Sequence, residues 1–189
     1  MYGLVNKAIK DLIISEFGED TWKTIRTTAQ VPVDSFVSME SYSDDITHKL
    51  VAAASDVLDM STDEVLEAFG RYWTTYTARQ GYGHYLRMAG NNLAEFLANL
   101  DMLHGRVSLS FAGLAPPSFE VSDVTERGLR LHYFSHRAGL APLVKGLLEG
   151  LGELFNTAIE VHHDRVRGTG NNADNAIDHD EFVITYLTS

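Results

Sequence analysis

A tyrosine, a serine and an arginine stand at every second position in one segment of this chain, as Tyr133, Ser135 and Arg137, after Leu129 and Leu131. At the spacing of a β-strand these five side chains share one face. A phenol, a hydroxyl and a guanidinium beside apolar residues form a polar fork suited to carboxylates. The segment predicts a site for an amphipathic ligand with carboxylates, although such a triplet alone is more typical of a surface strand.

A second segment, upstream, adds a candidate metal ligand. His104 closes an apolar helical stretch, and Pro117 follows thirteen positions later in a Pro-Pro pair. No second histidine stands three or four residues after His104, as a zinc pair on a helix requires. A single axial imidazole is the protein ligand that a heme iron needs.

In this order, the two segments resemble the H-NOX family, the heme-nitric oxide/oxygen binding domains related to the heme domain of soluble guanylate cyclase. The resemblance covers essentially the whole chain, from the opening pattern of Met1, Gly3 and Val5 to the final strand. It implies a non-covalent b-type heme, with His104 as the proximal iron ligand and Pro117 pressing the porphyrin out of plane. The groups implied to hydrogen-bond the heme propionates are Tyr133, Ser135 and Arg137.

The residues over the opposite heme face decide which gas binds. In oxygen-binding members a distal tyrosine donates a hydrogen bond to oxygen; here that place falls to Leu143, or to Pro142 if the gap is set differently. Trp73 falls where a polar distal partner sits in those members, and Ile9 replaces an aromatic residue. Trp73 keeps an indole N–H, although packing is its more ordinary role. The other residues expected to line the heme site are Val5, Leu147 and Met1.

Met1 leaves two readings open. Its thioether or its amino group would approach the iron in some states, or the terminus is frayed and takes no part.

Composition sets the broad class. The chain has 189 residues, a formal net charge of −11, 44% hydrophobic and 22% charged residues, and no cysteine. These values predict one domain over residues 1–189 that neither binds nucleic acid nor spans a membrane. The absence of cysteine excludes thiolate ligation and covalent heme attachment. The start lacks the features of a signal peptide, which favours a cytoplasmic location.

Hydrophobic periodicity predicts an α/β fold of the α+β kind, with a helical lobe over 1–61 packed on a mixed lobe over 62–189. The resemblance implies that the heme is buried between them. The mixed lobe should hold a four-stranded, mostly antiparallel sheet. The pattern leaves 105–113 open between a helix end and an extended piece. Predicted helices cover 3–16, 19–30, 44–58, 62–78, 84–103 and 140–155, and predicted strands cover 118–123, 128–136, 157–167 and 180–188. Gly146, Gly150 and Gly152 in the last helix make room for a heme edge or for a close helix.

Two neighbouring histidines suggest a metal site elsewhere. His162 and His163 are adjacent, so on a strand they face opposite ways and do not share a metal, while His179 approaches them across the final hairpin. His132 and His136 alternate with the Tyr133 face and are expected to point away from the ligand.

The resulting hypothesis is a sensor and not an enzyme. Nitric oxide or carbon monoxide binds ferrous heme, oxygen is excluded, and nitric oxide weakens the bond to His104 and relaxes the porphyrin. The signal passes to a separate protein, by resemblance a histidine kinase or a cyclic-dinucleotide enzyme. The alternatives are an oxygen-binding or redox heme protein, and a heme-free module for an acyl or tetrapyrrole ligand.

Overall fold

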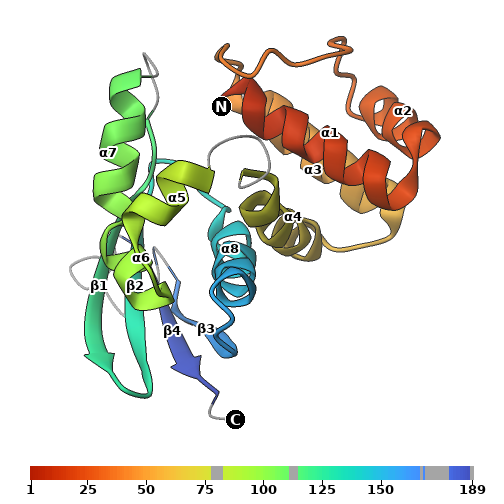
Figure 1. Cartoon of the computed structure of the whole chain (residues 1–189). Helices are drawn as coiled ribbons and strands as arrows, with labels where there is room; N and C mark the ends of the chain where they lie inside the picture. Colours follow the sequence, from red (N-terminus) through yellow and green to blue (C-terminus); the bar gives the residue numbers. More distant parts are fainter. Residues whose placement is uncertain (78–82, 111–114, 167, 169–178, 188–189) are drawn as a thin grey trace.

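The computed structural model describes residues 1–77, 83–110, 115–166, 168 and 179–187. Its helices and strands form two lobes, each with its own hydrophobic core. In Figure 1 the N-terminal helices lie apart from the sheet, with α4 and α8 between them. In the described part of the chain, no helix combines the length and the apolarity that crossing a membrane requires.

Three helices build most of the N-terminal lobe: α1 (Gly3–Phe17), α2 (Glu19–Thr28) and α3 (Asp44–Leu58). The first ends at Gly18, whose φ of 89° suits a residue without a Cβ. Their apolar faces meet in a core that includes Ile9, Ile13, Trp22, Ile25 and Leu50. These elements agree with the predicted ones to within two residues at each end.

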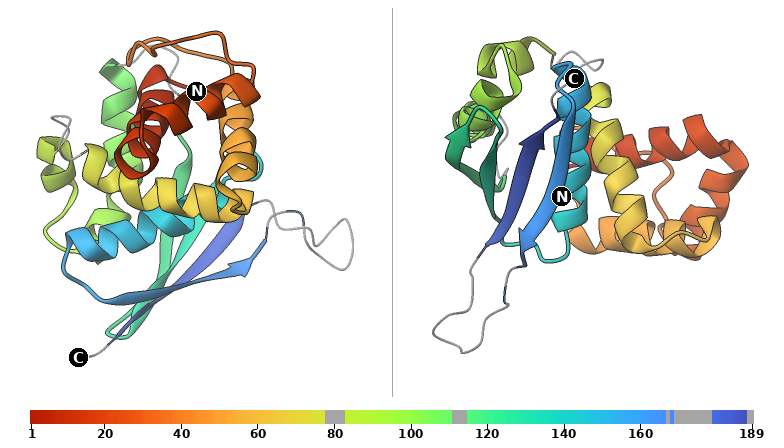
Figure 2. Two further views of the ribbon diagram at one scale, coloured as in Figure 1. Left: turned by 90° about the vertical axis from the view of Figure 1, so that its right-hand side faces the viewer. Right: turned by 90° about the horizontal axis from the view of Figure 1, so that it is seen from below.

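Helix α4 (Thr62–Thr77) belongs to both lobes. It begins with the predicted capping box, because the Ser61 hydroxyl accepts from the Glu64 amide at 3.2 Å and the Glu64 carboxylate accepts from the Ser61 amide at 2.7 Å. Its residues Val65 and Phe69 join the N-terminal core, while its other side lies along α8 (Figure 2). A division of the chain at residue 61 remains a proposal, since α4 contributes to the core of the first lobe.

Glycines explain how closely α4 and α8 (Ala141–Leu154) approach. A Cβ on Gly146 would lie 2.0 Å from the Glu67 carbonyl oxygen, and one on Gly70 would lie 2.3 Å from that of Leu143. Of the two explanations for Gly146, close helix packing is therefore the one that the structure supports.

The prediction of a single helix over 84–103 is wrong. The chain there forms three shorter helices because asparagines interrupt it: the Asn92 side chain accepts from the Glu95 amide at 2.9 Å, and the Asn99 side chain donates to the Ala89 carbonyl at 2.8 Å. The segment 105–113, which the sequence pattern left unassigned, is helical as far as Ser110, and residues 111–114 lie outside the described residues. The three helices are α5 (Gly83–Ala89), α6 (Leu93–Ala98) and α7 (Leu100–Ser110).

The sheet confirms the predicted four strands, and every neighbouring pair is antiparallel in the order β1-β2-β4-β3. Tyr133 pairs with Phe119 on one side and with Asp180 on the other. The alternate residues Leu129, Leu131 and Tyr133 are buried in the second core, against α6 and α8. The strands are β1 (Ser118–Thr125), β2 (Gly128–Phe134), β3 (Ile159–Arg165) and β4 (Asp180–Tyr186).

One detail of the strand prediction is wrong. Strand β2 ends at Phe134, so Ser135 and Arg137 lie in the bend that follows and not on the strand face. The backbone turns there toward α8, and the two side chains still reach the same cavity as Tyr133.

Candidate functional site

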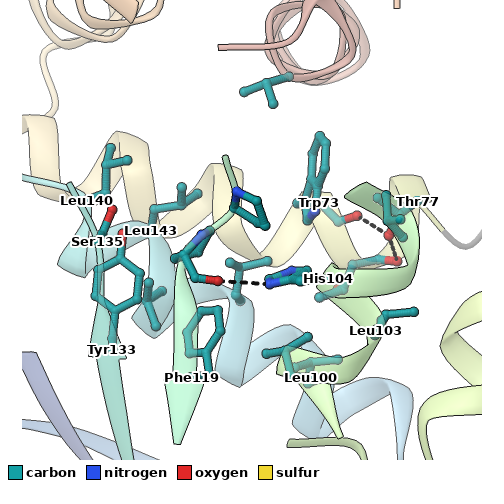
Figure 3. A pocket seen from close by; sticks show the side chains of 18 of the residues that line it. Trp73, Thr77, Leu100, Leu103, His104, Phe119, Tyr133, Ser135, Leu140 and Leu143 are labelled. Atoms are coloured by element: carbon teal, nitrogen blue, oxygen red, sulfur yellow. Dashed lines mark hydrogen bonds between the residues drawn. The ribbon is translucent and has the colours of Figure 1, made fainter. Parts of the chain in front are cut away.

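A cavity of about 370 Å³ lies between the two lobes. Helices α1, α4, α7 and α8 contribute to its wall, together with β2 and the segment that contains Pro117 (Figure 3). Most of the side chains that line it are apolar. They include Leu4, Phe69, Leu97, Leu100, Leu103, Val107, Phe119, Leu131, Leu140, Val144 and Leu148.

His104 enters this cavity from α7, and its ring orientation is fixed by a carbonyl. Its Nδ1 lies 3.1 Å from the Pro117 carbonyl oxygen, so Nδ1 carries the proton and donates it (Figure 3). This tautomer leaves the lone pair of Nε2 available. Burial lowers the pKa of His104 below its ordinary 6.5, against the raising effects of the Pro117 carbonyl and Asp101. The imidazole is therefore neutral at pH 7, as a metal ligand must be.

Asp101 ties the His104 helix to the sheet. Its carboxylate accepts from the Ser118 hydroxyl at 2.7 Å and from the Phe119 amide at 3.3 Å. The Phe119 ring lies 5.7 Å from the His104 ring, centroid to centroid. The sequence reasoning did not single out Asp101 or Phe119, since the contacts depend on how α7 docks on β1.

The polar fork lies at the ends of β2 and of the Pro117 segment. Tyr133 is buried, and the Ser135 hydroxyl accepts from the Arg137 amide at 3.1 Å. The Arg137 guanidinium donates from Nη1 to the Ala115 carbonyl at 2.9 Å and from Nε to Asp44 at 2.8 Å. These contacts hold a cation and hydroxyl groups beside the cavity, as the recognition of carboxylates requires.

Asp44 joins the two lobes at this point, and sequence reasoning missed it. Its carboxylate pairs with the amino group of Met1 through one oxygen and with Arg137 through the other. The hydrogen bond from the Met1 amino group lowers the pKa of Asp44, as does Arg137, whereas burial raises it. The Met1 amino group also donates to the Tyr42 carbonyl at 2.7 Å. The prediction of a frayed terminus is therefore wrong, because Asp44 and Tyr42 hold the amino group.

The wall opposite α7 carries the residues expected on the distal side. Trp73, Leu143, Val5, Leu147 and Met1 line the cavity. Two other candidates are not among the described residues that line it. These are Pro142 and Ile9, the latter being 4% exposed in the N-terminal core, one turn beyond Val5 on α1.

Other polar side chains on this wall had not been anticipated. Thr77 donates its hydroxyl to the Trp73 carbonyl at 2.8 Å, and Thr74 donates to the Arg71 carbonyl at 2.8 Å. Their donor protons are thus directed to their own helix. Tyr2 also lines the cavity, and its phenol is a second donor beside the Trp73 indole.

This donor set fits a b-type heme. Among the described residues of the cavity wall, His104 is the only histidine, and its free Nε2 suits an axial iron bond. The apolar side chains suit a porphyrin, and Arg137 with the neighbouring hydroxyls suits its two carboxylates. None of the described lining residues is an aspartate or a glutamate.

The adjacent histidines of β3 face opposite ways, as expected. His162 is exposed, while His163 is hydrogen-bonded to Asp180 at 2.9 Å and stacks on Phe182. His132 turns away from the cavity, also as expected, and contacts His179.

The comparisons with known proteins agree with heme as the cofactor. The model of the Haem-NO-binding family matches residues 2–163. Soluble guanylate cyclase gcy-31 of Caenorhabditis elegans is 32% identical over 170 residues, which are 87% of this chain and 24% of that protein. Guanylate cyclase soluble subunit beta-2 of Rattus norvegicus is 38% identical over 93 residues, 49% of this chain and 14% of that protein. The chain thus spans about a quarter, or less, of the length of these relatives.

The fold is also that of solved H-NOX structures. An H-NOX protein from S. oneidensis, in the Fe(II)NO ligation state, superposes with a TM-score of 0.86 at 20% identity, covering 100% of both chains. The Fe(II) unliganded H-NOX protein from K. algicida gives a TM-score of 0.82 at 21% identity, covering 100% of this chain and 98% of that one. By its family match and its cavity, this chain belongs to the Haem-NO-binding (H-NOX) family of heme-binding gas-sensor domains.

Proposed function

We propose that this chain binds nitric oxide and carbon monoxide at ferrous heme, discriminates against oxygen, and signals to a partner protein. Membership of a family of heme-based gas sensors supports the general part of this proposal. The observation that supports the finer part is the apolar wall opposite α7, which includes Leu143. Leu143 is the residue that the family resemblance assigns to the place of the tyrosine in oxygen binders.

Oxygen bound to ferrous heme gains most from a hydrogen-bond donor, whereas nitric oxide and carbon monoxide depend on one much less. The Thr74 and Thr77 hydroxyls are directed to carbonyls of α4. The Trp73 indole stacks on Tyr76, with ring centroids 6.2 Å apart, and meets Phe69 edge-on at 5.9 Å. These ring contacts explain Trp73 as a residue that packs in the N-terminal lobe. Because this role does not require the indole N–H to donate to a gas, it favours discrimination against oxygen.

A bound heme would supply an iron that can bind a gas. His104 would hold it on the α7 side, with Pro117 fixing the imidazole through its carbonyl. A displacement of the His104 ring is therefore transmitted to α7 and to the Pro117 segment. Arg137 contacts that segment at Ala115 and the N-terminal lobe at Asp44.

Such a shift between lobes is worth about 1–3 kcal/mol in typical allosteric proteins. The partner proposed from the family resemblance is a histidine kinase or a cyclic-dinucleotide enzyme. The guanylate cyclase relatives show that a matching segment also occurs within longer proteins, of which this chain spans about a quarter.

The test is a visible absorption spectrum of the heme-loaded protein after anaerobic reduction, then with nitric oxide, with carbon monoxide and in air. We expect a histidine-ligated ferrous heme that becomes a five-coordinate nitrosyl, forms a carbon monoxide complex and forms no oxygen complex. A stable oxygen complex would mean that Trp73 or Tyr2 donates to the gas. A protein that takes up no heme would refute the proposal.

A substitution of Arg137 tests whether the polar fork of Tyr133, Ser135 and Arg137 binds carboxylates. We expect Arg137→Ala to raise the rate of heme loss about 10- to 150-fold, because a charge-assisted hydrogen bond contributes about 1.5–3 kcal/mol. Transfer of heme to an apo-globin acceptor measures the rate. The matched control is Arg127→Ala at an exposed arginine of the β1–β2 turn, which should leave the rate unchanged. Equal rates in both variants would show that Arg137 serves only its contacts with Asp44 and Ala115.

A further inference from the structure

A second cluster of metal-ligating side chains lies on the outer face of the sheet, away from the cavity. His132 of β2 pairs directly across from Glu181 of β4, and both point to the face opposite Leu131 and Tyr133. His179 stands two residues before Glu181 and is therefore the diagonal neighbour of His132. The sheet register brings the three residues together, although 47 positions separate the two histidines.

The three ligand atoms are spaced as a metal site requires. Nδ1 of His132 lies 2.9 Å from Nε2 of His179, and Oε1 of Glu181 lies 3.9 Å from the first and 3.4 Å from the second. Around a tetrahedral zinc with bonds of 2.0–2.1 Å, neighbouring ligand atoms are about 3.3–3.4 Å apart. Shifts of about half an ångström in side chains would bring all three distances to that value.

Outer contacts hold the ligands in suitable orientations. The Ser122 hydroxyl lies 2.8 Å from Nε2 of His132, so it can accept the proton of that nitrogen and leave Nδ1 with its lone pair. Arg130 donates to Oε2 of Glu181 at 2.8 Å, which leaves Oε1 turned to the histidines. The His179 ring stacks on Phe134 with centroids 4.3 Å apart.

Burial and charge are compatible with a cation. The side chains of His132, His179 and Glu181 are 20%, 16% and 9% exposed, so the cluster is sheltered yet reachable. Arg130 lies nearby, but its charge is also balanced by carboxylates other than Glu181. These are Asp164 at 2.6 Å and Asp123 at 3.4 Å.

Two other charged groups lie near the cluster. Arg165 approaches Oε1 of Glu181 at 3.7 Å from an exposed side chain, which can swing into solvent. Glu120 of β1 pairs across from His132 and adds an acidic group to the same face. Because the positive charge of Arg165 and the negative charge of Glu120 offset each other, the site can still accept a positive ion.

We propose that His132, His179 and Glu181 bind a divalent transition metal, with Zn²⁺ as the expected ion, at a site separate from the heme. Two imidazoles and a carboxylate are a zinc-type ligand set and leave a fourth position for water or for a ligand from a partner. Because His132 precedes Tyr133, the ion would link β2 to β4 on the sheet face opposite Tyr133 of the polar fork.

The test measures Zn²⁺ binding to the heme-loaded chain, free of any affinity tag, by competition with a chromogenic chelator. We expect one equivalent of Zn²⁺ per chain, determined separately from the heme iron. His132→Ala and His179→Ala should each weaken binding at least about 100-fold, and Ser122→Ala about 10-fold, as the loss of a partner outside the ligand set does. The matched control is His162→Ala, an exposed histidine of β3, which should leave binding unchanged.

X-ray absorption at the Co²⁺ edge, after substitution of Co²⁺ for Zn²⁺, gives a second readout, since it reports a tetrahedral set of nitrogen and oxygen ligands without interference from the visible bands of the heme. The heme spectra of the variants check that they remain folded. Failure of the unsubstituted chain to bind an equivalent of Zn²⁺ overturns the proposal, whatever the variants do. Equal weakening by His162→Ala overturns it as well, because binding would then be adventitious.

Discussion

Replacement of His104 by glycine should abolish the histidine-ligated ferrous heme spectrum, and free imidazole should restore it. The expectation rests on the neutral imidazole whose Nδ1 donates to the Pro117 carbonyl and whose Nε2 faces the cavity. Glycine removes the ring and leaves room for an exogenous one. Heme affinity should fall at least about 10-fold, since even partners outside the ligand set contribute 10- to 100-fold. Absorption spectra of the reduced variant, with and without imidazole, measure both effects.

The control for this experiment is His136→Gly, an exposed histidine one residue from Arg137 that is not among the described lining residues. It should keep the spectrum of the unsubstituted chain. A His104→Gly protein with an unchanged ferrous spectrum would assign the axial bond to another residue. If it also bound heme as tightly as before, a tetrapyrrole-binding module in which His104 has only a structural role would become the better explanation of the cavity.

The sequence predicted the elements best where a pattern depends only on near neighbours. The capping box of Ser61 and Glu64 and the stop at Gly18 need no tertiary contact, and both appear in the structure. The helix over 84–103 failed because Asn92 and Asn99 acquire cap partners when the chain turns, and apolar periodicity carries no sign of such a turn.

In the candidate site too, the sequence indicates residues that follow a local pattern and misses those that depend on distant contacts. His104, Pro117 and Arg137 were identified from their order along the chain, and the structure brings all of them to one cavity. Asp44 was not identified, because its contact with Arg137 spans 93 positions and depends on how the two lobes meet. An ion pair between residues of two lobes has no local sequence signal. Only the structure therefore shows that the N-terminal lobe contacts the polar fork.

The outer face of the sheet is a further case. Sequence reasoning placed His179 near His162 and His163 across the last hairpin. The structure confirms that β3 and β4 pair, and His163 is hydrogen-bonded to Asp180, the residue after His179. The strand order β1-β2-β4-β3 adds β2 as the other neighbour of β4, so His132 becomes the partner of His179. Strand order is a non-local property, and here it adds a potential metal ligand that no local pattern indicates.

Introduction of a distal tyrosine by Leu143→Tyr should convert the protein into one that forms an oxygen complex. Leu143 lies on α8 at the cavity wall opposite α7, and its neighbours on that wall include Trp73 and Leu140 (Figure 3). A phenol there would donate a hydrogen bond in an apolar environment. A hydrogen bond contributes about 0.5–1.5 kcal/mol with a neutral acceptor and about 1.5–3 kcal/mol with a charged one, so oxygen affinity should rise about 2- to 150-fold. Spectra of the reduced variant in air, and the dissociation rate of oxygen, measure the gain.

Leu143→Phe is the matched control, because phenylalanine supplies the same ring without the hydroxyl. Only the tyrosine variant should hold oxygen, while both should still bind carbon monoxide. Oxygen binding by both variants would attribute the effect to altered packing of the Leu143 region. An absence of oxygen binding in both variants would mean that Leu143 does not face the gas. The residues to test next for gas selectivity would then be Trp73 of α4 and Tyr2, which also line the cavity. In either event the His104 experiment remains an independent test, since it concerns the opposite wall.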